Sequence, residues 1–372
     1  MKVSGITSGS PLCGSPIVLT VQANAVSESS TLAFHRIVVN VIAALEGVDT
    51  DFTVQSFHAT IGNETEEGRT KTFDISSALQ TVLDKYEYTP DAVTYPRVLF
   101  YVEAWEEMMI NGVPMTSDTY SYPSASGQYL YAIGGRYSDY ERRMAQSEFK
   151  KALRFSRKPS STPQIVCVGE TFAYTPAFTG EEGFDGYSLL DLPSGPTSVI
   201  TTITEEGAQQ IGGVSVYAMP KQMADRDRYE FRFINSLGVL ESVSVHSLAE
   251  TSANLETTQY TKAAIETFKN FSRAFYKKYD GAETIKMSSG PVDRYWQQWF
   301  VHEFLVSEHV WLFFPDMTKS TVRVSGEAEG VWLPVHITAE DTITLENRTT
   351  SDTLAVSFVV EMDDKGSVML AV

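Results

Sequence analysis

Short runs of β-branched and aromatic residues, each followed by Ser, Gly, Asp or Pro, recur along most of the chain. The first three are PIVLTVQA at 16–23, TLAFHRIVVNVIAA at 31–44 and DFTVQSFHAT at 51–60. Val, Ile, Thr and aromatic side chains favour the half-buried surface of a strand, whereas the intervening residues favour turns. The pattern therefore predicts a mainly β protein whose sheets pack as sandwiches.

Two β-hairpins are expected from their turn residues. The strand VLFYVEAW and the strand after it are joined around Asn111-Gly112, a dipeptide typical of two-residue hairpin turns. Arg228 to Ile234 and Val239 to Val245 are expected to pair across the turn at 235–238. Further strands are predicted at 128–133, 164–176, 197–203 and 214–219.

A short helix is expected at 74–86, where Leu79 and Val82 belong to an apolar stripe and Asp74 or Ser76 is the N-cap. A second is expected at 291–307, where Trp299 and Phe304 lie at helical spacing and Asp293 precedes them. Tyr260 to Lys278 mixes helix formers with β-branched and aromatic residues, so a helix and a long strand fit this stretch equally well. Four strands are predicted after the second helix, at 310–314, 330–337, 343–347 and 354–362.

With 372 residues, the chain is long enough for two or three domains, and we expect three. The expected fold class is mainly β, with tandem immunoglobulin- or fibronectin-like sandwiches followed by a C-terminal α+β domain with antiparallel strands. The segments are an N-terminal sandwich with a helical insert at 1–135, a basic helical linker or contact arm at 136–163, a second sandwich at 164–252 and the α+β domain at 253–372.

The chain is acidic, with 47 Asp and Glu against 29 Lys and Arg, a net charge of −18. This balance disfavours nucleic acid and anionic membranes as partners, because both are bound by clustered basic side chains. No apolar run approaches the ~20 residues that cross a bilayer, and the N-terminus lacks the apolar region of a secretory signal. Cys13 and Cys167, the two cysteines, suggest neither a disulfide framework nor a zinc site, so a reducing cytoplasm is expected.

Residues 136–158 reverse this balance, with eight basic and three acidic side chains, a local charge of +5. If acidic copies of the chain pack around a ring, this segment could contact the carboxylates of the next copy. The alternative is an ordinary solvated helix. The candidate subunit-contact residues are Arg142, Arg143, Lys150, Lys151 and Arg154.

No enzyme, cofactor or metal signature is found in the sequence. His302 and His309 are seven residues apart, whereas a zinc-binding helix needs a spacing of four. The neighbouring carboxylates Glu106 and Glu107 would lie on opposite faces of a strand. The aromatic cluster around Trp296 and Trp299, with Trp311 and Trp332, favours core packing over a carbohydrate site. We therefore expect a non-enzymatic protein without cofactors.

Three stretches carry a resemblance to a known family. They are YEFRFINSLGVLES, then VDRYWQQWFVHEFLVSEHVWLF after about 50 residues, then the C-terminal GVWLPVHITAEDTITLENRTTSDTLAVSFVVEM. Together with the opening GSPIVLTV…FHRI, this combination resembles tail and baseplate structural proteins of tailed bacteriophages and prophages of gut Bacteroidetes.

The resemblance implies a virion protein similar in role to a distal tail protein, which forms a ring between the tail tube and the receptor-binding apparatus. A homo-oligomeric ring, other tail proteins as partners, and assembly in the host cytoplasm are then expected. It implies no catalytic residues.

The alternative function is a glycan-binding or adhesion module built of sandwiches, suggested by Tyr120, Tyr122, Tyr129 and Tyr131. A hydrolase of surface polysaccharide is disfavoured because no pair of carboxylates is identifiable as its acid and base.

Overall fold

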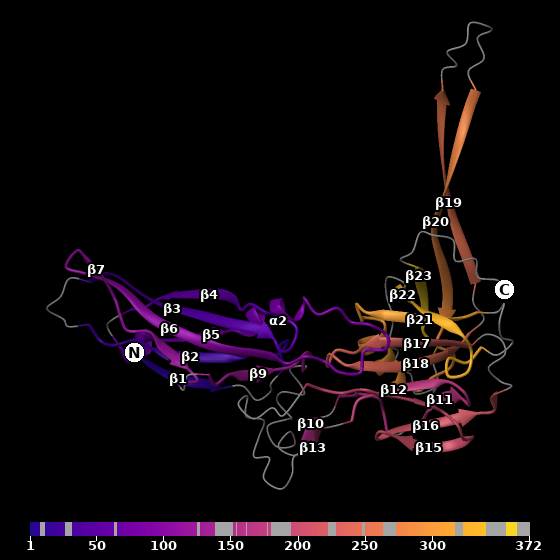
Figure 1. Cartoon of the computed structure of the whole chain (residues 1–372), viewed down its shortest axis with the longest axis horizontal. Helices are drawn as coiled ribbons and strands as arrows, with labels where there is room; N and C mark the ends of the chain where they lie inside the picture. Colours follow the sequence, from indigo (N-terminus) through magenta and orange to yellow (C-terminus); the bar gives the residue numbers. More distant parts are fainter. Residues whose placement is uncertain are drawn as a thin grey trace, which may run out of the picture. The chain divides into compact units, whose positions relative to one another are not determined.

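Two compact units make up the chain in this computed structural model. Unit 1 consists of Met1–Ser156, Thr175–Val199 and Ser236–Val239, and unit 2 of Arg157–Tyr174, Ile200–Asn235 and Leu240–Val372. The residues described are 1–7, 12–26, 32–62, 65–124, 127–137, 152–153, 155–160, 162–176, 178–179, 195–221, 228–247, 250–262, 273–316, 323–339 and 355–362. Both units consist mainly of antiparallel strands, which confirms the predicted fold class (Figure 1).

Unit 1 contains two sheets that follow the predicted strand pattern. The larger has the order β4-β3-β6-β7, with β8 and β9 also pairing with β6, and the smaller has the order β1-β2-β5. Their strands are β1 (Lys2–Thr7), β2 (Val18–Gln22), β3 (Leu32–Leu45), β4 (Thr53–Thr60), β5 (Thr70–Asp74), β6 (Val98–Ile110), β7 (Val113–Thr116), β8 (Tyr120–Tyr122) and β9 (Leu130–Ala132). At the predicted turn between β6 and β7, Asn111 and Gly112 both have positive φ, at 52° and 80°.

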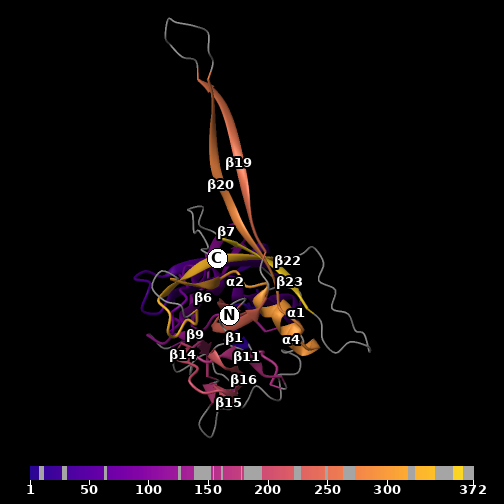
Figure 2. The ribbon, with the colours of Figure 1, turned by 90° about the vertical axis from the view of Figure 1, so that its right-hand side faces the viewer.

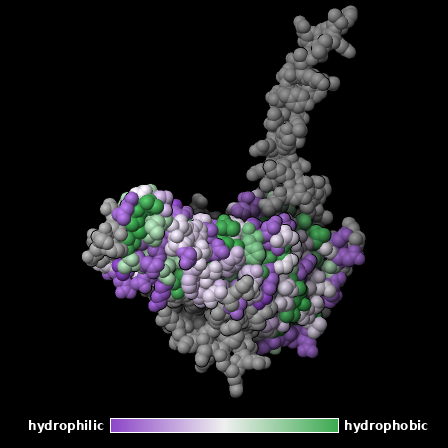
Figure 3. All heavy atoms as spheres, turned by 60° about the vertical axis from the view of Figure 1, so that its left-hand side comes forward, coloured by the Kyte–Doolittle hydropathy of each residue, from purple (hydrophilic) through white to green (hydrophobic). Residues whose placement is uncertain are grey.

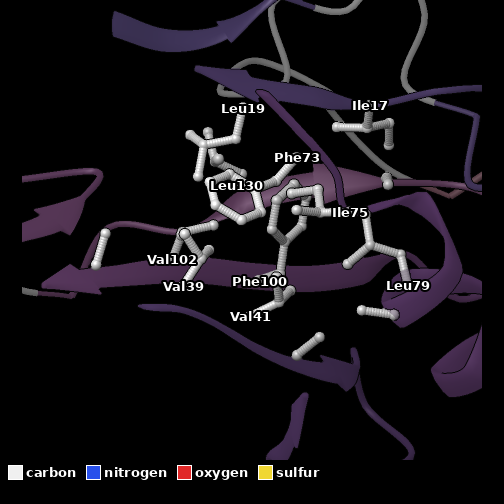
Figure 4. Close-up of a cluster of buried hydrophobic side chains, with 14 of the residues drawn as sticks. Ile17, Leu19, Val39, Val41, Phe73, Ile75, Leu79, Phe100, Val102 and Leu130 are labelled. Atoms are coloured by element: carbon white, nitrogen blue, oxygen red, sulfur yellow. The ribbon is translucent and has the colours of Figure 1, made fainter. Parts of the chain in front are cut away.

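The core of unit 1 is mostly aliphatic and lies between the two sheets. Alternate residues of β6 are buried, as expected for a strand with one covered face. Figure 4 shows Val39, Val41, Phe100 and Val102 from the larger sheet meeting Leu19 and other side chains from the smaller one. The predicted sandwich arrangement of this region therefore follows from its alternating sequence.

The helices of unit 1 are α1 (Glu66–Arg69) and α2 (Ser76–Leu83). Helix α2 lies where it is predicted, and Leu79 and Val82 are buried. Its N-cap is Ile75, however, and not Asp74 or Ser76. The Asp74 carboxylate instead accepts hydrogen bonds from the backbone N–H groups of Ser76 and Ile17, at 3.0 and 3.1 Å, which ties the start of the helix to the end of the loop before β2.

The linker expected at 136–163 contains a strand in its described part. Leu153, which the sequence places in a partial helix, lies in β10 (Ala152–Leu153) and pairs with Phe178 of β13 (Phe178–Thr179). This pairing partner is 25 residues away along the chain, so local helical spacing gave the wrong prediction there.

Unit 2 is built around one seven-stranded sheet of order β18-β17-β21-β22-β23-β20-β19. Its strands are β17 (Arg228–Ile234), β18 (Leu240–His246), β19 (Glu250–Lys262), β20 (Arg273–Ser288), β21 (Val310–Pro315), β22 (Gly330–Ala339) and β23 (Ser357–Met362). Strands from both sides of residue 252 share this sheet, so the domain boundary expected there falls inside one sheet. The chain accordingly forms two units instead of three domains and a linker.

Shorter strands complete unit 2. Strand β16 pairs in parallel with β11 and in antiparallel fashion with β15, and β12 pairs with β14. The bounds are β11 (Gln164–Cys167), β12 (Thr171–Tyr174), β14 (Val199–Thr202), β15 (Gly207–Ile211) and β16 (Val214–Met219). The strand predicted at 343–347 lies outside the described residues.

The helical segment of unit 2 supplies an aromatic core. Helix α4 (Arg294–Trp299) begins at Asp293, whose side chain accepts hydrogen bonds from the N–H groups of residues 295 and 296, and it continues as the π-helix η2 (Phe300–Phe304). Ring centroids of Trp296 and Phe300 lie 5.1 Å apart, and those of Phe300 and Phe304 lie 4.8 Å apart. The predicted helix is confirmed, although it ends at Phe304 and not at 307.

The described parts of the stretch that the sequence leaves undecided between helix and strand, 260–262 and 273–278, lie in strands β19 and β20 of a long hairpin. Strands β19 and β20 pair from Glu250 with Lys286 to Lys262 with Arg273. Strand β20 also pairs with β23, but only over Thr284–Ser288. Figure 2 shows the rest of the hairpin leaving the sheet as a two-stranded ribbon.

Candidate functional site

The five residues predicted to form a subunit contact are not among those that the structure describes. They are Arg142, Arg143, Lys150, Lys151 and Arg154. The role suggested for them stays a prediction, and candidate sites have to be sought elsewhere.

A buried ion pair in unit 2 joins β17 to the turn before β12. Arg228 Nε donates to Glu170 Oε1 at 2.7 Å, and Nη2 donates to Oε2 at 3.1 Å. The guanidinium also donates to the Ile165 carbonyl at 2.7 Å, and Ser244 Oγ donates to Glu170 Oε2 at 2.9 Å. This two-point pairing fits the planar geometry of both groups. The ion pair and its hydrogen bonds therefore link β17, β18, β11 and the turn before β12.

A second carboxyl group, Glu230, lies two residues along β17. It accepts a hydrogen bond from Ser325 N at 2.9 Å and another from Ser325 Oγ. The hydroxyl groups of Ser325 and Thr171 are 2.6 Å apart, and Arg232 Nη2 donates to Thr171 Oγ1 at 2.9 Å. The network links β17 to β12 and to the turn around residue 325.

Burial changes the protonation of this network. Desolvation, and then the nearby Glu170 carboxylate, raises the pKa of Glu230 to about 8, against the hydrogen bonds from Ser325 that lower it. Burial would lower the pKa of Arg228, but the Glu170 carboxylate raises it further, so the guanidinium stays charged. At neutral pH the network therefore holds one ion pair and one largely protonated carboxyl group.

The hydrogen bonds of the network link strands to one another. The Ser325 hydroxyl is engaged with Glu230 and also accepts a hydrogen bond from Thr171 N at 2.9 Å. Glu230 and Arg232 are 5% and 3% exposed, so a substrate has no direct access to the acid or to its positive neighbour. We interpret the network as structural.

Lys158 is a half-buried lysine of unit 2 whose ammonium group faces other parts of the unit. Its Nζ donates to the Ser242 carbonyl at 2.5 Å and lies 4.9 Å from the ring centroid of Phe172 and 5.1 Å from that of Trp299. Burial lowers the pKa of this lysine to about 8, although the Glu241 carboxylate raises it. These contacts suit a structural role for the ammonium group.

Unit 1 has a buried polar pair that the sequence did not reveal. His35 Nε2 lies 3.0 Å from Glu106 Oε2, and both side chains are fully buried. Asn24 N donates to Glu106 Oε1 at 3.1 Å. The neighbouring Glu107 pairs with Arg36 and is about one-third exposed, so these two carboxylates do lie on opposite faces of β6, as predicted. The only indication of this pair in the sequence was the position of Glu106, which alternation along the strand places on the opposite face of β6 from Glu107.

The two histidines near the helix of unit 2 and the two cysteines do not form a common site. His302 is exposed, and His309 stacks on Trp311 after the helix has ended. Cys13 and Cys167 are buried free thiols, and burial raises the pKa of each to about 12. Among the described residues, no group of three His, Cys, Asp or Glu side chains is placed to hold a metal ion.

The aromatic residues divide between core and surface. Trp296, Trp299 and Trp311 are buried, as core packing predicts, and Trp332 lies 4.1 Å from the Arg232 guanidinium. In unit 1, Tyr129 stacks on Phe52 with a centroid distance of 5.8 Å, and Tyr101 meets both rings edge-on. Phe52 is 41% exposed. This aromatic cluster is open to solvent on one side.

Apolar side chains also reach the surface at the β6–β7 hairpin. Met109, Val113 and Met115 are each more than one-third exposed. Figure 3 shows hydrophobic patches separated by hydrophilic ones on the face that it displays. No helix in the described part of the chain is long and apolar enough to cross a bilayer.

The remaining candidate surface is the ribbon of β19 and β20. Strand order puts β19 at the edge of the seven-stranded sheet, and β20 has β19 as its only described partner between Arg273 and Glu283. A two-stranded ribbon without further cover is only marginally stable in water, and its open edges can pair with another chain. The ribbon is therefore the element of unit 2 best suited to contact a partner.

Comparisons with family models, with curated proteins and with solved structures find no match to this chain. What the protein does therefore has to be inferred from its own residues.

Proposed function

We propose that the protein is a non-enzymatic structural component of a bacteriophage virion, a tail or baseplate protein of the distal-tail type that forms a ring between the tail tube and the receptor-binding apparatus. The three quoted stretches support this assignment by their resemblance to phage structural proteins. The structural observation that carries an assembly role is the β19–β20 ribbon, which continues beyond Thr284, where the pairing of β20 with β23 ends.

An assembly protein needs rigid faces and a protruding element for its neighbours. The sandwich of unit 1 and the seven-stranded sheet of unit 2 supply the faces, and the ribbon supplies the protrusion. The buried ion pair of Glu170 and Arg228 suits the same role, because it fixes strands in place without presenting reactive groups. The site of action is the phage tail, after assembly in the host cytoplasm.

Native mass spectrometry of the full chain over a wide concentration range tests this proposal. We expect a closed oligomer, alone or with a neighbouring tail protein, and we expect the chain among the proteins of purified phage particles. A chain that stays monomeric at every concentration, binds no tail protein and is absent from particles would contradict it. A tape-measure gene beside the coding gene would favour the tail tip in particular.

A second candidate function, glycan binding, is favoured by the open aromatic cluster of Phe52, Tyr101 and Tyr129. Exposed aromatic rings offer apolar faces on which sugar rings can stack. A glycan array distinguishes this function: it predicts binding by the wild type that Phe52→Ala together with Tyr129→Ala abolishes. A blank array would rule it out.

A further inference from the structure

A tryptophan lies on the same strand face as the tyrosine that β6 contributes to the open aromatic cluster. Residues two positions apart on a strand share a face, so Tyr101, Glu103 and Trp105 of β6 point the same way. Val102 and Ala104, which alternate with them, are buried in the core of unit 1. We call the side of the larger sheet that is turned away from this core the outer face. At about 3.3 Å per residue, Tyr101 and Trp105 are roughly 13 Å apart along β6.

A row of polar side chains crosses the outer face between these two rings. Asn40 of β3 is paired with Ser56 of β4 on one side and with Glu103 on the other. Glu103 is in turn paired with Ser121 of β8, and directly paired residues share a face. This polar row therefore presents two hydroxyl groups, an amide and a carboxylate side by side. Among the described residues, none forms a hydrogen bond or ion pair with the Glu103 carboxylate, so it is available as an acceptor for a ligand.

The rings lie over apolar residues of the neighbouring strand. Val38 pairs with Trp105 and belongs to the outer face, yet it is only 2% exposed. Ile42 pairs with Tyr101 and is likewise only 6% exposed. Trp105 Nε1 also donates to Glu107 Oε1 at 3.1 Å, which holds the indole ring in place. These contacts fit rings that lie along the sheet with one side turned to solvent, where a sugar ring can stack on them.

The charge of the outer face selects among possible ligands. Its charged residues on β3, β4 and β6 are Arg36, Glu103 and Glu107, so the face sums to 1 − 2 = −1. Arg36 is paired with Glu107. A nucleic acid or an acidic polysaccharide would be repelled by this face and by the chain of −18 around it. The polar row also divides the apolar surface in two, which disfavours a protein partner, because protein-binding patches are contiguous.

We propose that the outer face binds an uncharged oligosaccharide that lies along β6, with one sugar ring on the open aromatic cluster and another on Trp105. Hydroxyl groups of the sugar between them donate to the Glu103 carboxylate and accept from the Asn40 amide. This inference rests on glycan binding, the second candidate function, and names the ligand class of that site. Because the two ring sites are roughly 13 Å apart, the preferred ligand is a chain of several sugar rings and not a single sugar.

A glycan array tests the ligand class with the wild type. The array holds neutral and acidic oligosaccharides that range from single sugars to long chains. We expect binding to uncharged chains of several rings and weak or no binding to single sugars and acidic chains. Binding confined to acidic chains or to single sugars would overturn the inference.

Substitutions on the outer face test the extended site. Trp105→Ala should weaken binding of the tightest-binding chain of the array about tenfold, the size expected for one lost ring contact. Glu103→Gln should weaken it at least about threefold, because an ionised acceptor forms the stronger hydrogen bond. The matched control Tyr217→Ala removes an exposed ring from β16 of unit 2 and should bind as the wild type does. Isothermal titration calorimetry measures all three, and far-UV circular dichroism checks that they fold.

Hydroxyl-radical footprinting of the wild type tests the same contacts without a substitution. The radicals label solvent-accessible aromatic side chains, and mass spectrometry locates each label. The tightest-binding chain should lower the labelling of Tyr101 and Trp105 together and leave that of Tyr217 unchanged. Protection of Tyr101 without Trp105, or of neither, would refute the extended site.

The outcomes separate this inference from the candidate function on which it rests. If binding depends on Phe52 and Tyr129 but is unchanged in Trp105→Ala and Glu103→Gln, the extended site is refuted while glycan binding stands. If the outer face binds an oligonucleotide and no glycan, the proposed ligand class is refuted together with glycan binding. A blank array likewise contradicts both.

Discussion

The two units are both β-rich, but their interiors are filled by different side chains. The core of unit 1 is composed largely of Val, Ile, Leu and Ala, with Phe73 and Phe100 as its aromatic members. The core of unit 2 contains seven Phe and Trp residues, and unit 2 also buries charged side chains, among them Glu170, Glu230 and Arg232. An aliphatic core depends mainly on the apolar area that it covers, whereas a core with enclosed charges also depends on each charge keeping its partner.

Removing one partner of the buried ion pair between Glu170 and Arg228 should have the largest effect on stability. Arg228→Ala leaves Glu170 enclosed without its cation, so we expect a loss of about 3–5 kcal/mol in the free energy of unfolding of unit 2. The control, Arg36→Ala in unit 1, breaks the partly exposed pair with Glu107 and should cost about 1 kcal/mol or less. Urea unfolding followed by circular dichroism compares them. Equal losses would show that burial does not distinguish the two pairs.

Substitutions that shorten a core side chain should also reduce the free energy of unfolding more in unit 2 than in unit 1. Phe304→Ala removes a fully buried ring that contacts Phe231, Phe300 and Phe358, and should cost about 3–5 kcal/mol. Val41→Ala in unit 1 removes two methyl groups and should cost about 2 kcal/mol. Tryptophan fluorescence reports unit 2 selectively, because four of the five tryptophans lie there. A smaller loss for Phe304→Ala than for Val41→Ala would contradict the comparison.

The buried charges should also make the stability of unit 2 depend on pH. The pKa of Glu230 is about 8 in the folded chain and about 4.3 in an unfolded one, so the folded state binds the extra proton and the free energy of unfolding falls as pH rises from 4.3 to 8. The pKa of Lys158 is about 8 when folded and about 10.4 when unfolded, so the free energy of unfolding rises from pH 8 to 10.4. Above about pH 8.5 this rise is opposed by Cys167, whose pKa burial raises to about 12, so the clear expectation for unit 2 is the fall between pH 4.3 and 8.

The fall between pH 4.3 and 8 should be on the order of 5 kcal/mol, because each unit by which the pKa of Glu230 is raised contributes about 1.4 kcal/mol. Glu230→Gln should remove this fall, and Lys158→Met should make the free energy of unfolding fall more steeply above about pH 8.5. Urea unfolding of unit 2 at a series of pH values measures both. A wild-type profile that rises steadily between pH 5 and 8 would show that Glu230 is ionised throughout.

Replacing turn glycines should have the smallest effect on stability, and the effect should be the same in both units. Gly112 in unit 1 has φ +80° and Gly213 in unit 2 has φ +83°, and a Cβ atom at either would meet nothing within 4 Å. Alanine at each position should therefore cost about 1 kcal/mol from backbone strain alone. Thermal unfolding of Gly112→Ala and Gly213→Ala measures the two costs, and a clear difference between them would point to a contact in one turn.

Elements set by local pattern were predictable from the sequence. Alternation identified β2, β3, β4 and β6, and Asn111-Gly112 identified the turn after β6, because each depends on residues a few positions apart. The buried charge network was not predictable. In RYEFRFI, Arg228, Glu230 and Arg232 occupy alternate positions, a pattern typical of a solvent-facing side. That side is covered by β11, β12 and the turn at 325, whose approach depends on pairing between distant segments.

The same limit applies to the domain boundaries and to the ribbon. β17 pairs with β21 about 80 residues away, and such pairing leaves no local signal at residue 252. In 260–278, helix formers and strand formers are mixed, and for the described residues 260–262 and 273–278 only the pairing of β19 with β20 decides between helix and strand. The candidate contact residues between 142 and 154 stay a prediction, since the structure does not describe them.

Each unit also holds one of the two cysteines, Cys13 in unit 1 and Cys167 in unit 2, and both thiols are buried and unpaired with each other. A thiol reagent can reach either sulfur only when its own unit opens, because burial and the raised pKa suppress reaction in the closed state. The chain thus contains two native kinetic reporters. The variants Cys13→Ala and Cys167→Ala would isolate one reporter each, so that alkylation rates give the opening equilibrium of either unit within the full chain, without an added probe.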